Sequence, residues 1–228
     1  MYFVGEYFLR FMRDRVMGFI YFFLPAQPLG EKRYPYQKQF MKHQFKEGEK
    51  VLDVGSGGDP FPFATVLADK FIEPSVHRSS EFKSGGKSVY VCDICDMPFG
   101  NKEFDYVVAS HILEHVDNPI AACKELQRVG KAGYIESPTF MKDALFSWVK
   151  GIHNWQILSQ GNTLFFFEYT ERQKEGIRSE SFERLIFSTV YHPLQKAFND
   201  NQDIFNTMFE WKDWFDVIVV KKNGEILK

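Results

Sequence analysis

Short apolar runs rich in β-branched residues recur through the middle of this 228-residue chain, with helical or loop segments between them. The runs are hydrophobic throughout rather than alternating with polar residues, which is typical of parallel strands buried on both faces of a sheet. They cover residues 51–54, 64–68, 88–92, 106–109 and 132–136. The pattern predicts an α/β fold, with a sheet of mostly parallel strands and flanking helices.

The helix expected before the last of these runs has clear boundaries. Asp117 or Asn118 can cap it, Pro119 suits its first turn, and Gly130 ends it. Its expected buried stripe consists of Ile120, Cys123, Leu126 and Val129.

The two ends of the chain differ from its middle. Residues 1–24 are rich in Phe, Tyr and Met, and their apolar stretch 16–24 is shorter than the roughly 20 residues of a membrane span. An amphipathic helix that covers the domain or its active site is expected, with interfacial membrane contact and a cleaved signal as alternatives. Beyond residue 138 the chain is rich in aromatic residues. Strands are expected there at 163–169 and 215–220, with helical sequence over 182–198 between them.

Charge and cysteine content limit the partners and the compartment. The formal net charge is −2 and the isoelectric point about 6.3, so nucleic acid is not an expected partner. Three cysteines are too few, and odd in number, for a disulfide framework, and they fit a reducing, cytoplasmic compartment. Cys92 and Cys95 form a CxxC, which admits a redox or metal-binding role, although no second pair follows it.

The strongest chemical signal lies where the first apolar run meets a glycine-rich turn, VLDVGSGG over residues 51–58. Glycines there let the backbone approach a ligand closely at the carboxyl edge of the sheet. An NAD fingerprint, GxGxxG, would need glycine where the chain has Pro60, and Asp53 lies two residues before Gly55. A plain tight turn is the alternative interpretation.

An acidic residue followed by GxG resembles motif I of the class I S-adenosylmethionine (SAM)-dependent methyltransferases, whose sheet is Rossmann-like. Three further segments match in the order that this family has. The second run ends at Asp69, the third runs into Asp93, and residues 103–116 have an FD-strand-HxLEHV pattern similar to the fourth motif. This last segment is most similar to the branch related to quinone-biosynthesis methyltransferases.

The resemblance implies SAM as the cofactor and gives roles to residues at the strand ends. Asp69 would accept hydrogen bonds from the ribose hydroxyls, with Glu73 as a weaker candidate. Asp93 would accept from the adenine amino group while Ile94 packs on the ring. The expected cofactor-binding set is Asp53, Gly55, Ser56, Gly57, Asp69, Asp93, Ile94, Ser110 and His111. An exposed strand-end charge is the alternative for Asp69, and a turn-forming aspartate for Asp93; no metal site is predicted.

The resemblance also implies a single methyltransferase domain over residues 1–228. Residues 1–36 would form a helical cover, 37–138 the SAM-binding core, and 139–228 the acceptor-side elements and closing strands. Pro60 and Pro62 disfavour the helix that usually follows the glycine turn, which is therefore expected to be short or missing. The oligomeric state stays open.

The implied reaction is a direct displacement, in which an acceptor atom attacks the sulfonium methyl of SAM. Positioning supplies most of the acceleration, and a hydroxyl acceptor also benefits from a general base. His111 is the first candidate base because it follows the fourth run, with Glu136 and His153 as outside candidates; a structural or cofactor-contacting role is the alternative. Aromatic segments at 153–155 and 165–169 suit a glycan or small-metabolite acceptor, unless they are ordinary core.

Two rival functions stand beside this one. Residues 111–115 match HxxEH, the zinc-binding signature of the inverzincin metallopeptidases. In that interpretation His111 and His115 share one helical face and bind zinc, and Glu114 is the general base. The other rival is a methyltransferase fold that binds SAM, or nothing, and serves as a scaffold.

Overall fold

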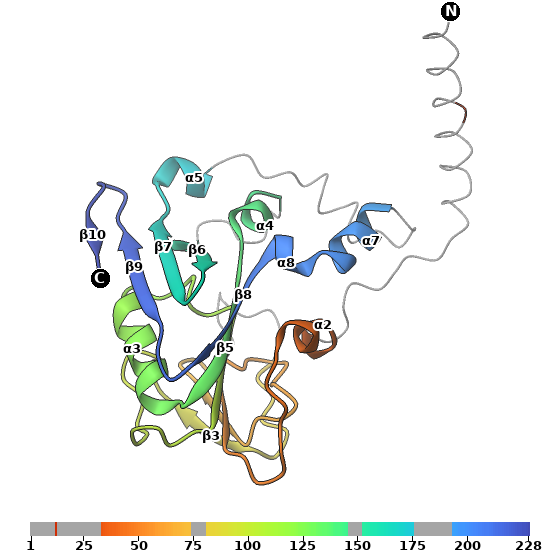
Figure 1. The fold of residues 1–228 in the computed structure, drawn as a ribbon, viewed down its shortest axis with the longest axis vertical. Helices are drawn as coiled ribbons and strands as arrows, with labels where there is room; N and C mark the ends of the chain where they lie inside the picture. Colours follow the sequence, from red (N-terminus) through yellow and green to blue (C-terminus); the bar gives the residue numbers. More distant parts are fainter. Residues whose placement is uncertain (1–11, 13–32, 74–80, 146–151, 176–192) are drawn as a thin grey trace, which may run out of the picture.

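A computed structural model of the chain describes residues 12, 33–73, 81–145, 152–175 and 193–228 (Figure 1). The helical cover expected over residues 1–24 lies outside the described residues except for Met12. Most of the helical sequence expected over 182–198 also lies outside them, and α7 (Pro193–Asp200) occupies its end.

The central element is a six-stranded sheet in the order β3-β2-β1-β4-β5-β8. Its strands are β1 (Val51–Val54), β2 (Val66–Asp69), β3 (Ser88–Val91), β4 (Tyr106–Ser110), β5 (Ala132–Pro138) and β8 (Asn206–Lys212). The five strands from β3 to β5 pair in parallel, whereas β8 is antiparallel to β5. The predicted α/β fold with a mostly parallel, Rossmann-like sheet is confirmed. The second strand begins two residues later than expected and includes Asp69.

Strands β1 and β4 are buried on both faces, with alternate side chains in opposite layers, whereas the edge strand β3, which was also expected to be buried, is mostly exposed. On one face, Leu52 and Val54 pack with Val107 and Ala109 against helix α3 (Pro119–Val129). On the other face, Val51 and Val108 pack with residues that follow α2 (Arg33–Phe40), so helices lie on both sides of the sheet (Figure 1). This arrangement explains why the runs of the central strands β1 and β4 are apolar throughout.

A second sheet, in the order β10-β9-β7-β6, packs on the α3 side of the same core. Its strands are β6 (Trp155–Gln160), β7 (Thr163–Glu168), β9 (Asp216–Val220) and β10 (Ile226–Leu227). Short helices α4 (Phe140–Leu145), α5 (Glu171–Glu175) and α8 (Gln202–Phe205) connect these elements. The strands expected at 163–169 and 215–220 correspond to β7 and β9, whereas α2, β6 and β8 were not anticipated.

Helix α3 has the boundaries that the sequence predicts, and its cap yields a test. The Asn118 side chain accepts a hydrogen bond of 3.1 Å from the Ala121 backbone N–H. We expect Asn118→Ala to lower the free energy of unfolding by about 1 kcal/mol, measured by urea denaturation. Asp117→Ala is the matched control because the sequence offers both residues as caps. An equal loss in the two variants would contradict this assignment.

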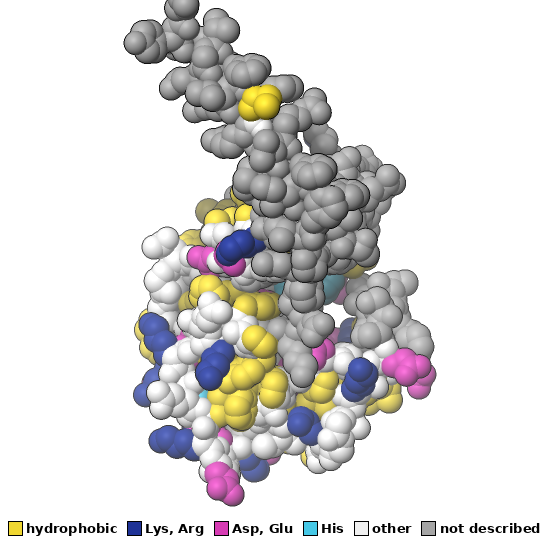
Figure 2. All heavy atoms as spheres, turned by 90° about the vertical axis from the view of Figure 1, so that its right-hand side faces the viewer, with side chains coloured by type: hydrophobic (Ala, Val, Ile, Leu, Met, Phe, Trp, Pro, Cys, Tyr) yellow, Lys and Arg dark blue, Asp and Glu magenta, His cyan; other side chains and the backbone are white. Residues whose placement is uncertain are grey.

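The surface of the described residues carries charges of both signs. Figure 2 shows the side at the right of Figure 1, where lysine and arginine side chains are scattered among acidic and hydrophobic ones. The described residues on this face therefore show no broad basic patch. Among the helices that the structure describes, none has the length and apolar character that crossing a membrane requires.

Candidate functional site

The glycine turn lies at the carboxyl end of β1, and its backbone requires glycine. Gly55 and Gly57 have φ angles of +70° and +55°, in the left-handed region that L-residues with side chains rarely adopt. A Cβ atom at position 55 would lie 2.7 Å from Ile112 Cδ1. Close packing against the segment after β4 therefore shapes this turn.

Asp69 at the end of β2 is brought directly beside the turn. Its Oδ2 accepts a 3.1 Å hydrogen bond from the Gly57 backbone N–H, and its Oδ1 accepts one of 2.9 Å from Phe71. The carboxylate thus lies where a ligand on the turn would meet it. Glu73 lies beyond the strand end and is exposed.

A cavity of about 110 Å³ opens beside this turn. Its polar lining includes Asp53, Ser56 and Ser110, and Tyr34, Pro60 and Phe61 are among its apolar walls. Asp53 is buried and accepts a 2.7 Å hydrogen bond from the Phe61 backbone N–H. The chain between β1 and β2 forms turns and no helix, as expected from Pro60 and Pro62.

The Ser56 hydroxyl gives the cavity an unmet hydrogen-bonding group. Its Oγ is buried and has no hydrogen-bond partner among the described residues. Because a buried polar atom without a partner costs free energy, a polar ligand in the cavity would stabilise it. The glycine turn, the Asp69 carboxylate and this hydroxyl together fit a nucleoside cofactor such as SAM.

Asp93 and Ile94 lie further along the same edge, after β3. Asp93 accepts a 2.8 Å hydrogen bond from Lys70 Nζ and one of 2.9 Å from the Cys95 backbone N–H. The bond from Lys70 is the main reason that the pKa of Asp93 is lowered. Ile94 is buried in the core. Their adenine-binding roles stay predictions.

The neighbouring CxxC has the character of packed thiols. Cys92 and Cys95 are half-buried, and no disulfide joins them. Burial raises the pKa of both thiols, that of Cys95 to about 11. Because the thiolate is the redox and metal-binding form, these environments do not favour such roles.

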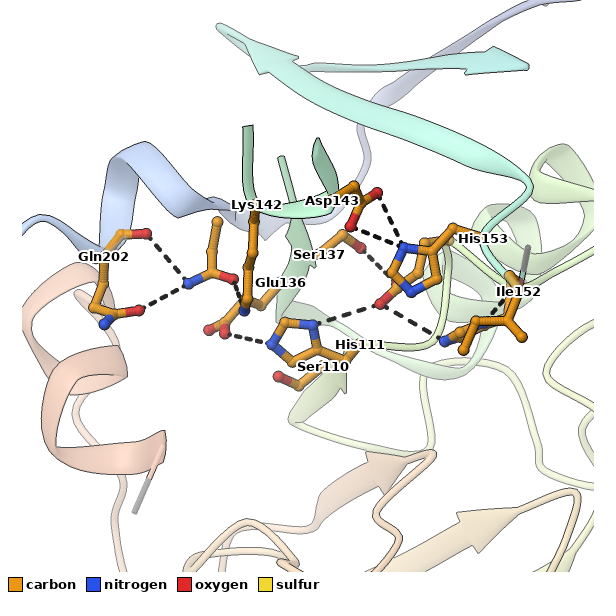
Figure 3. Close-up of polar contacts among 12 residues, drawn as sticks. Ser110, His111, Glu136, Ser137, Lys142, Asp143, Ile152, His153 and Gln202 are labelled. Atoms are coloured by element: carbon orange, nitrogen blue, oxygen red, sulfur yellow. Dashed lines mark hydrogen bonds and ion pairs between the residues drawn. The ribbon is translucent and has the colours of Figure 1, made fainter. Parts of the chain in front are cut away.

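His111 lies after β4 between two buried carboxylates (Figure 3). Its Nε2 is 3.1 Å from Glu136 Oε1 on β5, and its Nδ1 is 3.5 Å from Glu114 Oε1. His111 has a φ of +57°, an uncommon conformation for a residue other than glycine. Such conformations cluster at functional sites.

The two glutamates remain ionised despite complete burial. Burial itself raises the pKa of Glu136, but hydrogen bonds and charge from His111, with further hydrogen bonds from Tyr36 and Tyr134, lower it to about 2. Burial likewise raises the pKa of Glu114, and the three histidines His111, His115 and His153 lower it to about 2. The cluster therefore holds fixed negative charge beside the cofactor cavity.

Two further histidines join this cluster. His115 Nδ1 lies 3.1 Å from the Ile152 carbonyl oxygen, and His153 Nδ1 lies 3.0 Å from the Asp143 carboxylate. Residues 111–116 form a bend and a turn rather than a helix. The helical geometry assumed for an HxxEH metallopeptidase is therefore wrong.

The structure brings together the three residues that the sequence named as candidate bases, His111, Glu136 and His153. It adds Gln37 of α2, whose side chain donates hydrogen bonds to Ser110 Oγ and to Glu136 Oε2. It also adds Asp143, for which the sequence offered no signal. Several aromatic residues expected to face an acceptor, including Trp155 and Phe166, are core residues instead.

Comparisons with known proteins locate the similarity in the parallel strands of the six-stranded sheet. Residues 52–135 match the family model described as a methyltransferase domain. A demethylmenaquinone methyltransferase of Staphylococcus carnosus (strain TM300) is 30% identical over 115 residues, which are 45% of this chain and 48% of the relative. A cycloartenol-C-24-methyltransferase 1 of Oryza sativa subsp. japonica is 35% identical over 100 residues, 39% of this chain and 29% of the relative.

A SAM-dependent methyltransferase from Aquifex aeolicus is among the similar solved structures, with a TM-score of 0.35 and 22% identity over 47% of this chain and 64% of that one. The chain spans about half the length of the first curated relative and less of the second. The match begins within β1 and ends within β5, so it includes the glycine turn, Asp69, Asp93 and His111. Residues 52–135 of this chain are therefore similar to the methyltransferase domain of SAM-dependent enzymes.

Proposed function

We propose that the chain transfers a methyl group from SAM to a hydroxyl of a glycan or small metabolite. The glycine turn carries this proposal, because Asp69 is bonded to Gly57 beside the buried, unpartnered hydroxyl of Ser56. A cofactor with a ribose and polar ends would supply partners for these groups. SAM supplies an activated methyl, so the protein has mainly to bind and position.

Individual residues take the following parts in the proposed complex. Asp69 accepts from the ribose hydroxyls, Asp93 accepts from the adenine, and Ile94 contributes to the wall against the ring. Asp53 and Ser56 line the cavity beside the turn. Ser110 and His111, at the end of β4, face the side where an acceptor would approach.

His111 is the proposed general base. The neutral imidazole would donate its Nε2–H to Glu136 at 3.1 Å and would take the proton of a hydroxyl acceptor at Nδ1, which lies 3.5 Å from Glu114 Oε1. The product of this proton transfer is an imidazolium. Fixed carboxylates at these positions would stabilise the imidazolium, much as a buried carboxylate does in hydrolase triads.

The acceptor class rests on the chain's own chemistry. The two curated relatives are named for different acceptors, demethylmenaquinone and cycloartenol, so their names do not define the acceptor here. A general base beside the cavity favours a neutral hydroxyl over an acceptor that is already nucleophilic. We also propose that the protein does not bind nucleic acid and that residues 1–24 contact a membrane surface.

Calorimetric titration with SAM and with S-adenosylhomocysteine tests the cofactor site. We expect Asp69→Ala to weaken binding of both about 100-fold, because two charge-assisted hydrogen bonds of about 1.5 kcal/mol each are lost. Asp69→Asn should recover part of this loss, since its amide oxygen can still accept from Gly57. Glu73→Ala is the matched control and should bind like the unsubstituted protein.

Comparison of the Asp69 and Glu73 variants distinguishes the possible outcomes of this titration. Loss of binding in Glu73→Ala with normal binding in Asp69→Ala would mean that the ribose site is misassigned. A folded protein that binds neither compound would overturn the proposed function. Binding followed by methyl transfer in a screen of hydroxylated glycans and metabolites would establish the acceptor class.

A further inference from the structure

The imidazoles of His115 and His153 converge on one buried carboxylate. Glu114 is 1% exposed, and ligand atoms of Glu114, His115 and His153 all lie within 4.8 Å of one another. His115 Nε2 is 3.9 Å from Glu114 Oε1. A tetrahedral zinc ion, with bonds of about 2.0–2.2 Å, spaces its ligand atoms about 3.4 Å apart. Side-chain rotations that move these ligand atoms by roughly an ångström would therefore bring all three within bonding distance of one ion.

The opposite nitrogen of each imidazole is already held by an acceptor. His115 Nδ1 faces the Ile152 carbonyl oxygen at 3.1 Å, and His153 Nδ1 faces both oxygens of Asp143 at 3.0 Å (Figure 3). Metal-binding histidines usually donate their second N–H to a carbonyl or carboxylate in this way. These contacts engage Nδ1 of both rings, and Nε2 of His115 faces Glu114 Oε1 at 3.9 Å.

The surrounding hydrogen bonds also fix the other members. Ser137 Oγ donates to Glu114 Oε2 at 3.1 Å, which leaves Glu114 Oε1 directed at the histidines. Tyr169 donates its hydroxyl hydrogen to Asp143 at 2.8 Å. The ligand set is thus oriented by partners from β5 and α4 and by Tyr169, which directly follows β7.

The charge balance of the cluster calls for a cation. Glu114, Glu136 and Asp143 place three carboxylates around the histidines, and two of these carboxylates are almost fully buried. Within the part of the chain that the structure describes, the ion-pair partners of Glu114 are histidines alone. Buried charge is tolerated when it is paired or coordinates a metal, and a divalent ion would balance it without requiring protonated imidazoles.

We propose that Glu114, His115 and His153 bind a divalent first-row transition metal ion, with zinc as the preferred ion. Two imidazoles and one carboxylate suit zinc or iron(II), whereas magnesium and calcium prefer oxygen ligands alone. Three protein ligands would leave a coordination position open, and His111 Nδ1 lies 3.5 Å from the ligand atom Glu114 Oε1. The site implies no peptidase activity and does not depend on the proposed methyl transfer.

The metal would also join two parts of the fold. The Asn154 backbone N–H and the Trp155 indole N–H already donate to the Glu114 and Val116 carbonyl oxygens. Coordination by His153 would add a direct link between the segment before β6 and the loop after β4. Metal binding should therefore raise the melting temperature.

The test uses full-length protein purified without a metal-affinity step. Its metal content is measured by mass spectrometry, and the protein stripped with a chelator is titrated with zinc and with cobalt(II). We expect about one equivalent of zinc or iron per chain. Cobalt should give the intense visible absorption bands of a site with a low coordination number. Zinc should reverse the fall in melting temperature that stripping causes.

Variants locate the site. Glu114→Gln keeps the shape and the Ser137 contact, and His153→Ala removes one imidazole; both should lose stoichiometric binding. Asp143→Asn should weaken it about 10–100-fold, because it removes the carboxylate that orients His153. His43→Ala, in a histidine that pairs with Glu49 elsewhere, and Cys95→Ser should bind metal normally.

Two results would overturn the proposal. In the first, the unsubstituted protein carries no transition metal, gives no cobalt absorption bands and shows no change of melting temperature with zinc. This result does not depend on whether a variant folds. The other is metal that persists in Glu114→Gln and His153→Ala but is lost in Cys95→Ser, which would place it at the CxxC. Neither result bears on SAM binding, which the calorimetry above measures separately.

Discussion

Gly133→Ala is expected to destabilise the protein by about 3 kcal/mol, the upper part of the usual range for overpacking. A Cβ atom at this position in β5 would lie 2.3 Å from the Val107 carbonyl oxygen and 2.9 Å from the Trp211 ring. Val107 and Trp211 are the residues that pair with Gly133 on β4 and β8. Relief would require the backbone of the sheet to separate where the site residues are positioned.

Urea denaturation followed by circular dichroism measures this loss. Gly100→Ala is the matched control, because a Cβ there meets only Glu103 Oε2 at an ordinary 3.5 Å. We expect little change in that variant. Similar midpoints for the two variants would show that β5 can shift away from β4 without cost, contrary to the close pairing described here.

The parallel strands and helix α3 were predictable because their signals are local. Burial on both faces requires uninterrupted apolar runs, and the Asn118-Pro119 start and Gly130 end mark a helix within a few residues of sequence. The second strand was placed two residues early because the apolar run extends beyond the paired segment. Sequence periodicity identifies an element better than it identifies its ends.

The remaining elements depend on contacts that no local pattern records. Strand β8 pairs with β5, about 70 residues earlier in the chain, and its register places Trp211 opposite Gly133. Helix α2 has little apolar periodicity, yet it positions Gln37 over the sheet. Its buried amide donates to Ser110 and Glu136, about 73 and 99 residues away. Long-range burial, rather than propensity, determines both elements.

The proposed cofactor-binding residues and the histidine cluster differ in the same way, because only the first carry local sequence signals. Asp53, Gly55 and Asp69 could be named from the sequence because each lies in or directly after a recognisable strand. His111, Glu136 and His153 could be named as candidates, but not as neighbours. Asp143 could not be named at all, because its meaning comes from His153, to which it is joined only in the folded chain.

His111→Asn is expected to lower kcat for a hydroxyl acceptor by about 10²–10⁴-fold, the usual contribution of a general base. Asparagine suits the test because it tolerates the φ of +57° found at this position, and its amide nitrogen, which lies near the place of Nδ1, can still donate to Glu114. The affinity for SAM should change little. Turnover is measured with radiolabelled SAM and the acceptor found in the screen.

A matched substitution distinguishes catalysis from stability. His43 also pairs with a glutamate, Glu49 at 2.9 Å. It lies outside the group of histidines and carboxylates around Glu114, so His43→Asn should keep normal turnover. If His111→Asn reduces the melting temperature and SAM affinity together with kcat, its role is structural. If it retains normal turnover, the acceptor needs no base at this position, and the preference for a hydroxyl acceptor loses its main support.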